Sequence, residues 1–226
     1  MELVKSTVVL QFSEAINPWV EMRSIIRNVG ETPSAEIEGS PVIIDLKNKK
    51  QRVVLHIRSF EFTQEEIDSI EDSINGAVDK LIKSNSSSKL PQIKQLSYES
   101  SFIEPYAVPF HELLILMKKR FLQPSALVDP TTDIGLIFDQ IEGDVFKHYQ
   151  IGPMGKEQLL KMYLHYKRDQ VPDNFVFLSL QYQQNKEFTF DEDNVRKFLE
   201  VAGQWQTHQA KSVLSYLKGG GSSNVK

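Results

Sequence analysis

The chain has 226 residues, of which 40% are hydrophobic and 25% charged, the composition of a packed globular protein. It contains no cysteine, which excludes thiolate catalysis, cysteine-ligated zinc, iron–sulfur clusters and disulfides. The formal net charge is −4 and the basic residues are scattered, unlike the clustered Lys and Arg of a nucleic-acid-binding protein. No apolar run approaches the roughly 20 residues that cross a bilayer, so we expect a cytoplasmic protein with neither a membrane nor a nucleic-acid partner.

The first half of the sequence begins with a predicted strand and a helix. Val8, Leu10 and Phe12 alternate with their neighbours as in a strand. Pro18 suits the first turn of a helix, where a missing N–H costs nothing, and Gly30 is a typical helix end.

Two or three strands and a second helix should complete this half. The strands are expected between residues 35 and 62, where 42–46 is a short apolar run and 52–62 a long alternating segment. A capping box at 63–66 then predicts a helix start, and the linker candidate 84–88 predicts its end. The apolar stripe of this helix comprises Ile67, Ile70, Ile74, Ala77, Val78 and Leu81.

The second half begins in the same way and continues with more strands. A strand over 96–102 precedes the sequence Val108-Pro109-Phe110, which opens a helix. Turn residues then separate four expected strands, and a closing helix ends at a run of glycines. The four strands are 134–141, 145–151, 159–167 and 174–182, and the closing helix spans about 191–218.

A shared order of helices and strands, together with short matching sequences, indicates that the two halves are related. Asn17-Pro18-Trp19 matches Val108-Pro109-Phe110, and Glu61-Phe62-Thr63 matches Glu187-Phe188-Thr189. We therefore divide the chain into a first half, 1–88, a second half, 89–218, and a flexible tail, 219–226. The predicted fold class is α+β: two tandem β-α-β(3–4)-α units that form a curved antiparallel sheet with helices on one face.

Two resemblances accompany this pattern. The element order resembles the duplicated TATA-binding-protein-like fold, and order alone implies no function. The strand at Leu96-Ser97-Tyr98, the following Pro109-Phe110 and the segment 175–217 are similar to a sporadically distributed prokaryotic family of proteins of this length. That family brings no assigned activity and no site residue.

The titratable residues form no catalytic or metal-binding pattern. The five histidines show no metal-ligand spacing, although His148 and His165 lie on neighbouring expected strands. The acids at 191–193 stand where a helix start needs a cap and negative charge. We therefore predict no catalytic residue, no metal site and no cofactor.

One face of the predicted sheet mixes aromatic with basic and amide side chains. If Val176, Leu178 and Leu180 face the helices, their neighbours must point to the open face, because strand residues alternate. Aromatic and Arg residues are enriched at protein interfaces. The predicted partner-binding residues are His56, Arg58, Lys161, Tyr163, His165, Phe175, Phe177 and Gln181.

This face predicts a non-enzymatic binding or assembly protein that takes a protein partner or a second copy of itself. The alternative is an enzyme or small-ligand binder with a pocket between the halves. A cleft that gathers Arg58, His56, His165 or Asp139 would favour that alternative.

Overall fold

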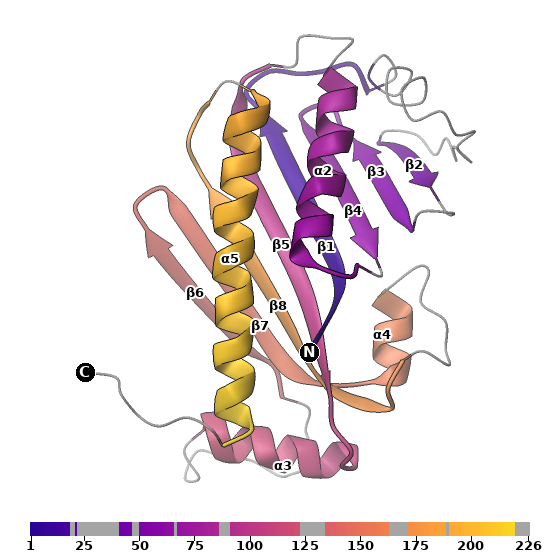
Figure 1. Ribbon diagram of the computed structural model, residues 1–226, viewed down its shortest axis with the longest axis vertical. Helices are drawn as coiled ribbons and strands as arrows, with labels where there is room; N and C mark the ends of the chain where they lie inside the picture. The colour runs from indigo at the N-terminus through magenta and orange to yellow at the C-terminus, as the bar shows by residue number, and fades with distance from the viewer. Residues whose placement is uncertain are drawn as a thin grey trace.

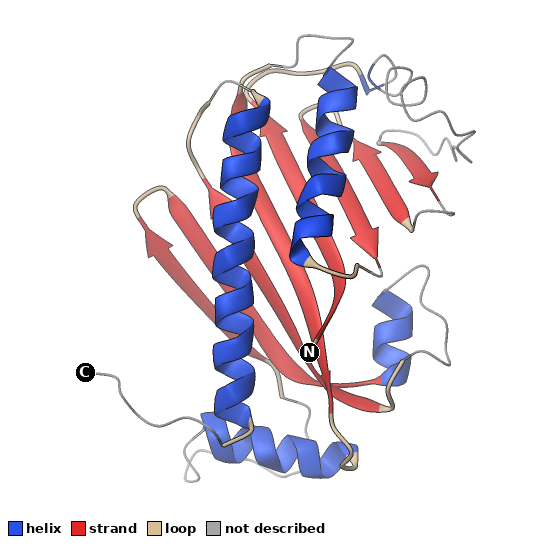
Figure 2. Cartoon of the chain, viewed as in Figure 1, coloured by secondary structure: helices blue, strands red, loops and turns tan. Residues whose placement is uncertain are grey.

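One curved, unclosed antiparallel sheet of eight strands organises the computed structural model (Figure 1, Figure 2). The structure describes residues 1–18, 21, 41–46, 50–65, 67–85, 91–122, 134–162, 171–188 and 190–219. The first four strands are β1 (Glu2–Phe12), β2 (Val42–Leu46), β3 (Gln51–Leu55) and β4 (Ser59–Glu65). The other four are β5 (Ile93–Pro105), β6 (Leu136–Glu142), β7 (Val145–Gly155) and β8 (Asn174–Gln184).

The two sides of the sheet have the same strand order when each is followed outward from the centre. The order β2-β3-β4-β1-β5-β8-β7-β6 places β1 against β5 in the middle, and β4, β3 and β2 on one side mirror β8, β7 and β6 on the other. Each half thus contributes four strands to the sheet, and in the second half the helix α4 (Lys156–Met162) stands between β7 and β8 along the chain. In the first half the amide of Glu21 donates to the carbonyl of Asn17 at 3.2 Å, the bond of a helical turn, and the rest of the predicted first helix lies outside the described residues.

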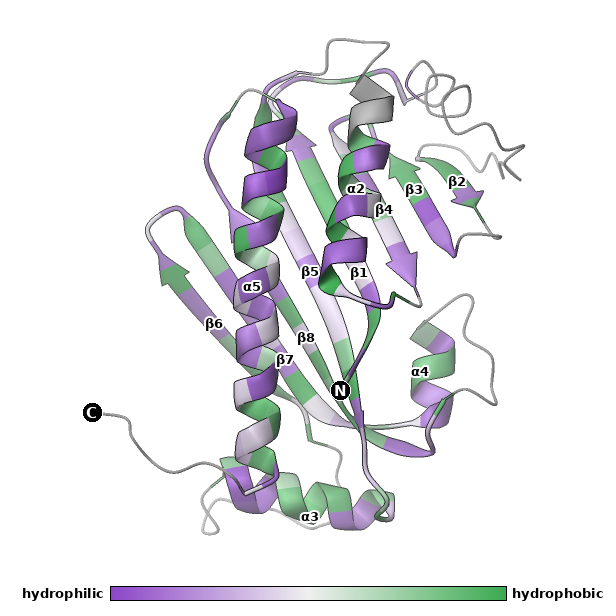
Figure 3. Ribbon diagram, viewed as in Figure 1, coloured by the Kyte–Doolittle hydropathy of each residue, from purple (hydrophilic) through white to green (hydrophobic). Residues whose placement is uncertain are grey.

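Helices cover the face of the sheet that Figure 1 turns toward the viewer. On this front face, α2 (Ile70–Asn85) and α5 (Glu192–Leu217) lie side by side, and α3 (Phe110–Phe121) crosses the lower end of α5. Figure 3 shows that α5 turns mostly hydrophilic residues away from the sheet, as an amphipathic helix does. A short fourth helix, α4 (Lys156–Met162), packs on the opposite face.

The main core lies between the front face and the helices. One cluster joins β1 to β5 with α2 and the first half of α5, and a second joins β5, β7 and β8 with α3 and the second half of α5. The third cluster is on the back face, where Leu159 of α4 packs on β5 and β8. This division follows from the alternation of side chains along each strand.

Several predicted element boundaries are corrected by the structure. The expected strand 52–62 is two strands, because a turn at 56–58 folds β4 back onto β3. The capping box at 63–66 is wrong: Thr63 lies within β4, and the hydroxyl of Ser69 accepts the amide of Asp72 at 3.0 Å at the start of α2 instead. Asp191 does cap α5, since its carboxylate accepts the amide of Asn194 at 2.8 Å.

The strand expected over 159–167 is also wrong where the structure describes it. Residues 156–162, which include the start of that expected strand, form α4. Residues 163–170 lie outside the described residues. The sequence Lys156-Glu-Gln-Leu-Leu-Lys-Met162 consists of good helix formers. Helix propensity therefore overrides the period-two alternation that predicted a strand.

Candidate functional site

The structure places six of the eight residues predicted to bind a partner, and these six do not form one surface. His56 and Arg58 are exposed in the turn between β3 and β4, and Lys161 is exposed on α4. Tyr163 and His165 lie outside the described residues. The remaining three residues, Phe175, Phe177 and Gln181, share the back face of β8, as predicted from alternation.

Phe175 and Phe177 are core residues and do not line an open surface. They are 0% and 3% exposed because Leu159 and Val171 pack over them together with Ile103 of β5. Gln181, further along β8, is half-buried and lies opposite Glu99 of β5. The part of the back face that α4 covers is therefore not open to a partner.

The β6–β7 hairpin carries the most exposed apolar side chains of the sheet. Gly143 has φ +59° in the turn, a left-handed conformation that suits glycine, and it lets β6 fold directly onto β7. β6 is the outermost strand on this side. Ile137 and Ile141 on its back face are 61% and 76% exposed, and Phe138 on its front face is 51% exposed.

We call this end of the molecule the β6–β7 surface. It consists of Ile137, Phe138, Asp139, Ile141, Phe146, His148 and Gln150. Large apolar side chains that protrude on both faces of an edge strand are a typical interaction or aggregation site in soluble proteins.

On the back face this surface also has a hydrogen-bonded pair of polar side chains. Nδ1 of His148 lies 2.6 Å from Oδ1 of Asp139, directly across the strand pair, and the imidazole stacks on the ring of Phe146 with centroids 6.3 Å apart. The sequence placed His148 on a strand next to that of His165 without assigning it a partner, and in the structure its partner is Asp139. Strand register, which sequence does not reveal, decides this pairing.

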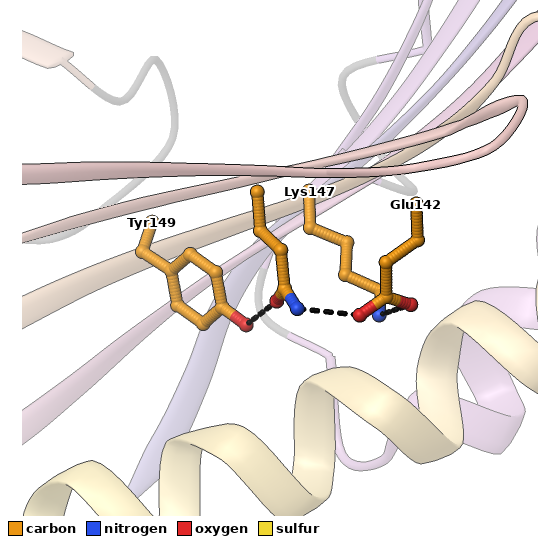
Figure 4. Close-up of polar contacts among 4 residues, drawn as sticks. Glu142, Lys147 and Tyr149 are labelled. Atoms are coloured by element: carbon orange, nitrogen blue, oxygen red, sulfur yellow. Dashed lines mark hydrogen bonds and ion pairs between the residues drawn. The ribbon is translucent and has the colours of Figure 1, made fainter.

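The front face of the same hairpin has a chain of polar contacts (Figure 4). The hydroxyl of Tyr149 donates to Gln140 at 3.4 Å, Gln140 donates to Glu142, and Nζ of Lys147 lies 2.6 Å from Glu142. Lys147 also lies over the ring of Trp205 in α5, 5.8 Å from its centroid. These contacts hold the hairpin against the edge of the helix layer.

The front face of the hairpin is partly covered by α5, as the contacts of Tyr149 show. Its ring meets Trp205 edge-on with centroids 5.2 Å apart. Burial raises the pKa of Tyr149, Lys147 lowers it and Glu142 raises it further, so the phenol stays protonated and able to donate.

The other edge of the sheet provides an internal comparison. β2 occupies in the first half the place that β6 occupies in the second. The front-face residues of β2, Val42, Ile44 and Leu46, are all buried, whereas on β6 Phe138 is half exposed. Of the two edge strands, β6 therefore has the more exposed front face.

A cleft of about 570 Å³ lies between α2 of the first half and α5 of the second. Its floor is formed by Ile70, Ile74 and Gly203. Nη1 of Arg196 donates to Asn75 at 2.9 Å across it. The charged and polar rim comprises Glu71, Asn75, Arg196, Glu200, Gln204, Thr207, His208 and Lys211.

This cleft is a pocket between the halves, but it gathers other residues than those predicted. His56, Arg58 and Asp139 do not line it, and His165 lies outside the described residues. The signal that was missed is helical: positions 196, 200, 204, 207, 208 and 211 recur at the spacing of one helix face. Within the described ranges, no group of three or more His, Asp or Glu is placed to hold a metal ion. No described helix is long and apolar enough to cross a membrane.

Comparisons with known proteins assign neither a family nor a function to the chain. No protein-family model matches the chain, and no curated protein sequence matches it. Among solved structures, the TBP of Methanococcus jannaschii is similar over 96% of this chain and 98% of that chain, with 12% sequence identity and a TM-score of 0.33. This similarity concerns the arrangement of the backbone alone. The resemblance to a prokaryotic family stays an expectation.

Proposed function

We propose that the protein is a non-enzymatic binding or assembly protein whose protein partner occupies the β6–β7 surface. The observation that carries the proposal is the edge strand β6, with Ile137, Phe138 and Ile141 exposed on its two faces. The proposal keeps the open face of the sheet as the binding surface and moves its centre away from Phe175 and Phe177, which are buried.

The chemistry of the surface defines the kind of partner. An edge strand offers a row of backbone N–H and C=O groups, and an extended segment that adds as the next strand pairs with them. Such a segment also needs apolar side chains on alternate positions to cover Ile137 and Ile141. The His148–Asp139 pair adds a polar contact of defined position on the same face.

Site-specific photo-crosslinking in the native host tests this proposal. A photoreactive phenylalanine analogue at position 141 should give a light-dependent protein adduct, whether with another protein or with the same protein. The matched control is position 57, where Ile57 is also apolar and exposed, at 53%, but lies in the turn between β3 and β4. No adduct at 141, or equal adducts at both positions, would overturn the proposal.

The cleft between α2 and α5 supports a second candidate, the binding of a small molecule. It combines an apolar floor with side chains of both charges, as ligand pockets do. A metabolite that binds there should raise Tm in proportion to its concentration, and Arg196→Ala should abolish the shift without unfolding the protein. A compound collection that shifts no Tm, or a shift that Arg196→Ala retains, would count against this candidate.

A further inference from the structure

We infer that the β6–β7 surface binds a second copy of this chain, with the two β6 strands paired antiparallel about a two-fold axis at Asp139. The inference rests on the proposed function, because it names the partner of the same surface. It joins two eight-stranded sheets into one continuous sheet.

The first argument is that β6 has the residue pattern of an interior strand. Ile137 and Ile141 project from its back face and Phe138 from its front face, and all three are more than half exposed. Side chains on a strand pack against those of the strands paired with it, on both faces of the sheet. Among the described strands β6 is paired with β7 alone, so a further strand on its other side would cover Ile137, Phe138 and Ile141 more completely.

The second argument is that β6 is complementary to itself in one register. Two-fold antiparallel pairing joins residues on the same face, so the register changes only in steps of two. In the register that overlaps all seven residues, Ile137 lies opposite the partner's Ile141, and this contact occurs twice. A shift of two residues in either direction places an isoleucine opposite the partner's Asp139. Full overlap and apolar matching therefore select the same register.

The front face agrees with this register. Phe138 lies opposite the partner's Gln140, whose methylene groups can cover the aromatic ring, and again the contact occurs twice. A two-fold interface uses the same strand in both copies, so it closes at the dimer and does not continue into a fibre. The edge strand would thereby be protected from further pairing.

One feature of the proposed interface opposes association. Asp139 lies opposite its own copy on the axis, and like charges directly opposite each other destabilise a strand pair. Each carboxylate also has Nδ1 of its own His148 at 2.6 Å. Replacing Asp139 by Asn should therefore strengthen the dimer, an effect that non-specific apolar association does not predict.

Sedimentation equilibrium of the purified protein over a concentration series tests the inference. Wild type should show a monomer–dimer equilibrium. Ile141→Lys should raise its dissociation constant by about tenfold or more, equivalent to ~1.4 kcal/mol, and Asp139→Asn should lower it. Ile57→Lys, at another exposed isoleucine away from β6, should leave it unchanged. Because all these side chains are exposed, each variant should keep the wild-type circular dichroism and Tm.

The absence of cysteine allows a direct test of the register. Asp139→Cys introduces the only thiol of the chain, and facing positions in a strand pair are close enough for a disulfide. Mild oxidation should give a covalent dimer of Asp139→Cys and none of Gln150→Cys, which is exposed on the same face of β7. Equal crosslinking of the two variants would contradict the register.

The outcomes separate this inference from the proposed function. A protein that stays monomeric at every concentration but gives a photo-adduct with another protein at position 141 overturns the inference and leaves the proposed function standing. A monomer without any such adduct overturns both. A dimer that Ile141→Lys and Asp139→Asn do not change uses another interface and also overturns the inference.

Discussion

Gly203 of α5 lies so close to Ile70 of α2 that a β-carbon at Gly203 would stand 2.6 Å from Cγ2 of Ile70. The two helices belong to different halves of the chain, so this glycine sets how closely the halves pack. The same approach forms the floor of the cleft between them.

We predict that Gly203→Ala lowers the free energy of unfolding by about 1–2 kcal/mol. Alanine favours a helix over glycine by about 1 kcal/mol, but overpacking a core costs roughly 1–3 kcal/mol, and Ile70 is β-branched and stiff. Urea denaturation measures the difference. In an Ile70→Ala background the clash is removed, so Gly203→Ala should become neutral or stabilising. A loss of the same size in both backgrounds would show that the contact with Ile70 is not the cause.

A second prediction concerns Gln206 of α5, whose side chain is fully buried between this helix and the sheet. Its amide nitrogen donates to the carbonyls of Tyr98 and Leu180 at 2.8 and 2.9 Å, and its oxygen accepts from Ser100 at 2.7 Å. Gln206→Leu should lower the free energy of unfolding by roughly 1–3 kcal/mol, because the buried Ser100 hydroxyl loses this acceptor. Gln204→Leu, exposed on the same helix, is the control in urea denaturation and should change stability by less than about 0.5 kcal/mol.

A third prediction separates core from surface along β8. Phe177→Ala should lower the free energy of unfolding by about 3–5 kcal/mol, as expected for a large buried aromatic residue. Gln181→Ala, four residues further on the same face, should cost less than about 1 kcal/mol because its side chain is only half-buried. Thermal and urea unfolding of both variants provide the comparison. Equal, small effects would mean that α4 does not cover Phe177 in solution.

The fourth prediction is a pH dependence carried by Glu104. This buried carboxylate pairs with Nζ of Lys218 and with the amine of Met1. Burial alone would raise the pKa of Glu104, but the hydrogen bonds and charges of these two cations outweigh it and hold the pKa below its ordinary value of 4.5.

Because the pKa of Glu104 is lower in the folded protein than in the unfolded chain, the pair stabilises the fold above about pH 4.5. That stabilisation is lost as the pH falls through the folded-state pKa. Wild type should therefore be more stable than Glu104→Gln at pH 7, and the gap between their urea midpoints should close in acid. The other carboxylates are common to both proteins and cancel. A gap that is the same at pH 7 and pH 3 contradicts the assignment.

Local sequence determined most of the helices and strands of this protein. The period of Ile74, Ala77, Val78 and Leu81 defined α2, and the alternation of Val176, Leu178 and Leu180 correctly predicted which side of β8 faces the helices. The Pro109 and Gly219 boundaries also follow from local preferences, since proline suits a helix start and glycine adopts the positive φ of a helix end. These features depend on residues a few positions apart, which is why sequence suffices for them.

The turn at 56–58 and the helix α4 were missed because their local signals conflict with the structure. His56-Ile57-Arg58 contains no glycine, proline, asparagine or aspartate, so nothing marks it as a turn. In α4, Leu160 and Met162 alternate as in a strand while the residues around them favour a helix. Packing of Leu159 on the back face decides the matter, and that contact joins segments far apart in the sequence.

Tertiary structure alone decided which apolar side chains of the sheet are exposed. Ile137 and Ile141 look like ordinary core residues in the sequence, and they are exposed on the back face of β6, the last strand of the sheet. Phe175 and Phe177 look suited to an interface, and they are buried only because α4 folds over them. Alternation tells which residues share a face of a strand, but strand order, register and the cover on each face are set by contacts between distant segments.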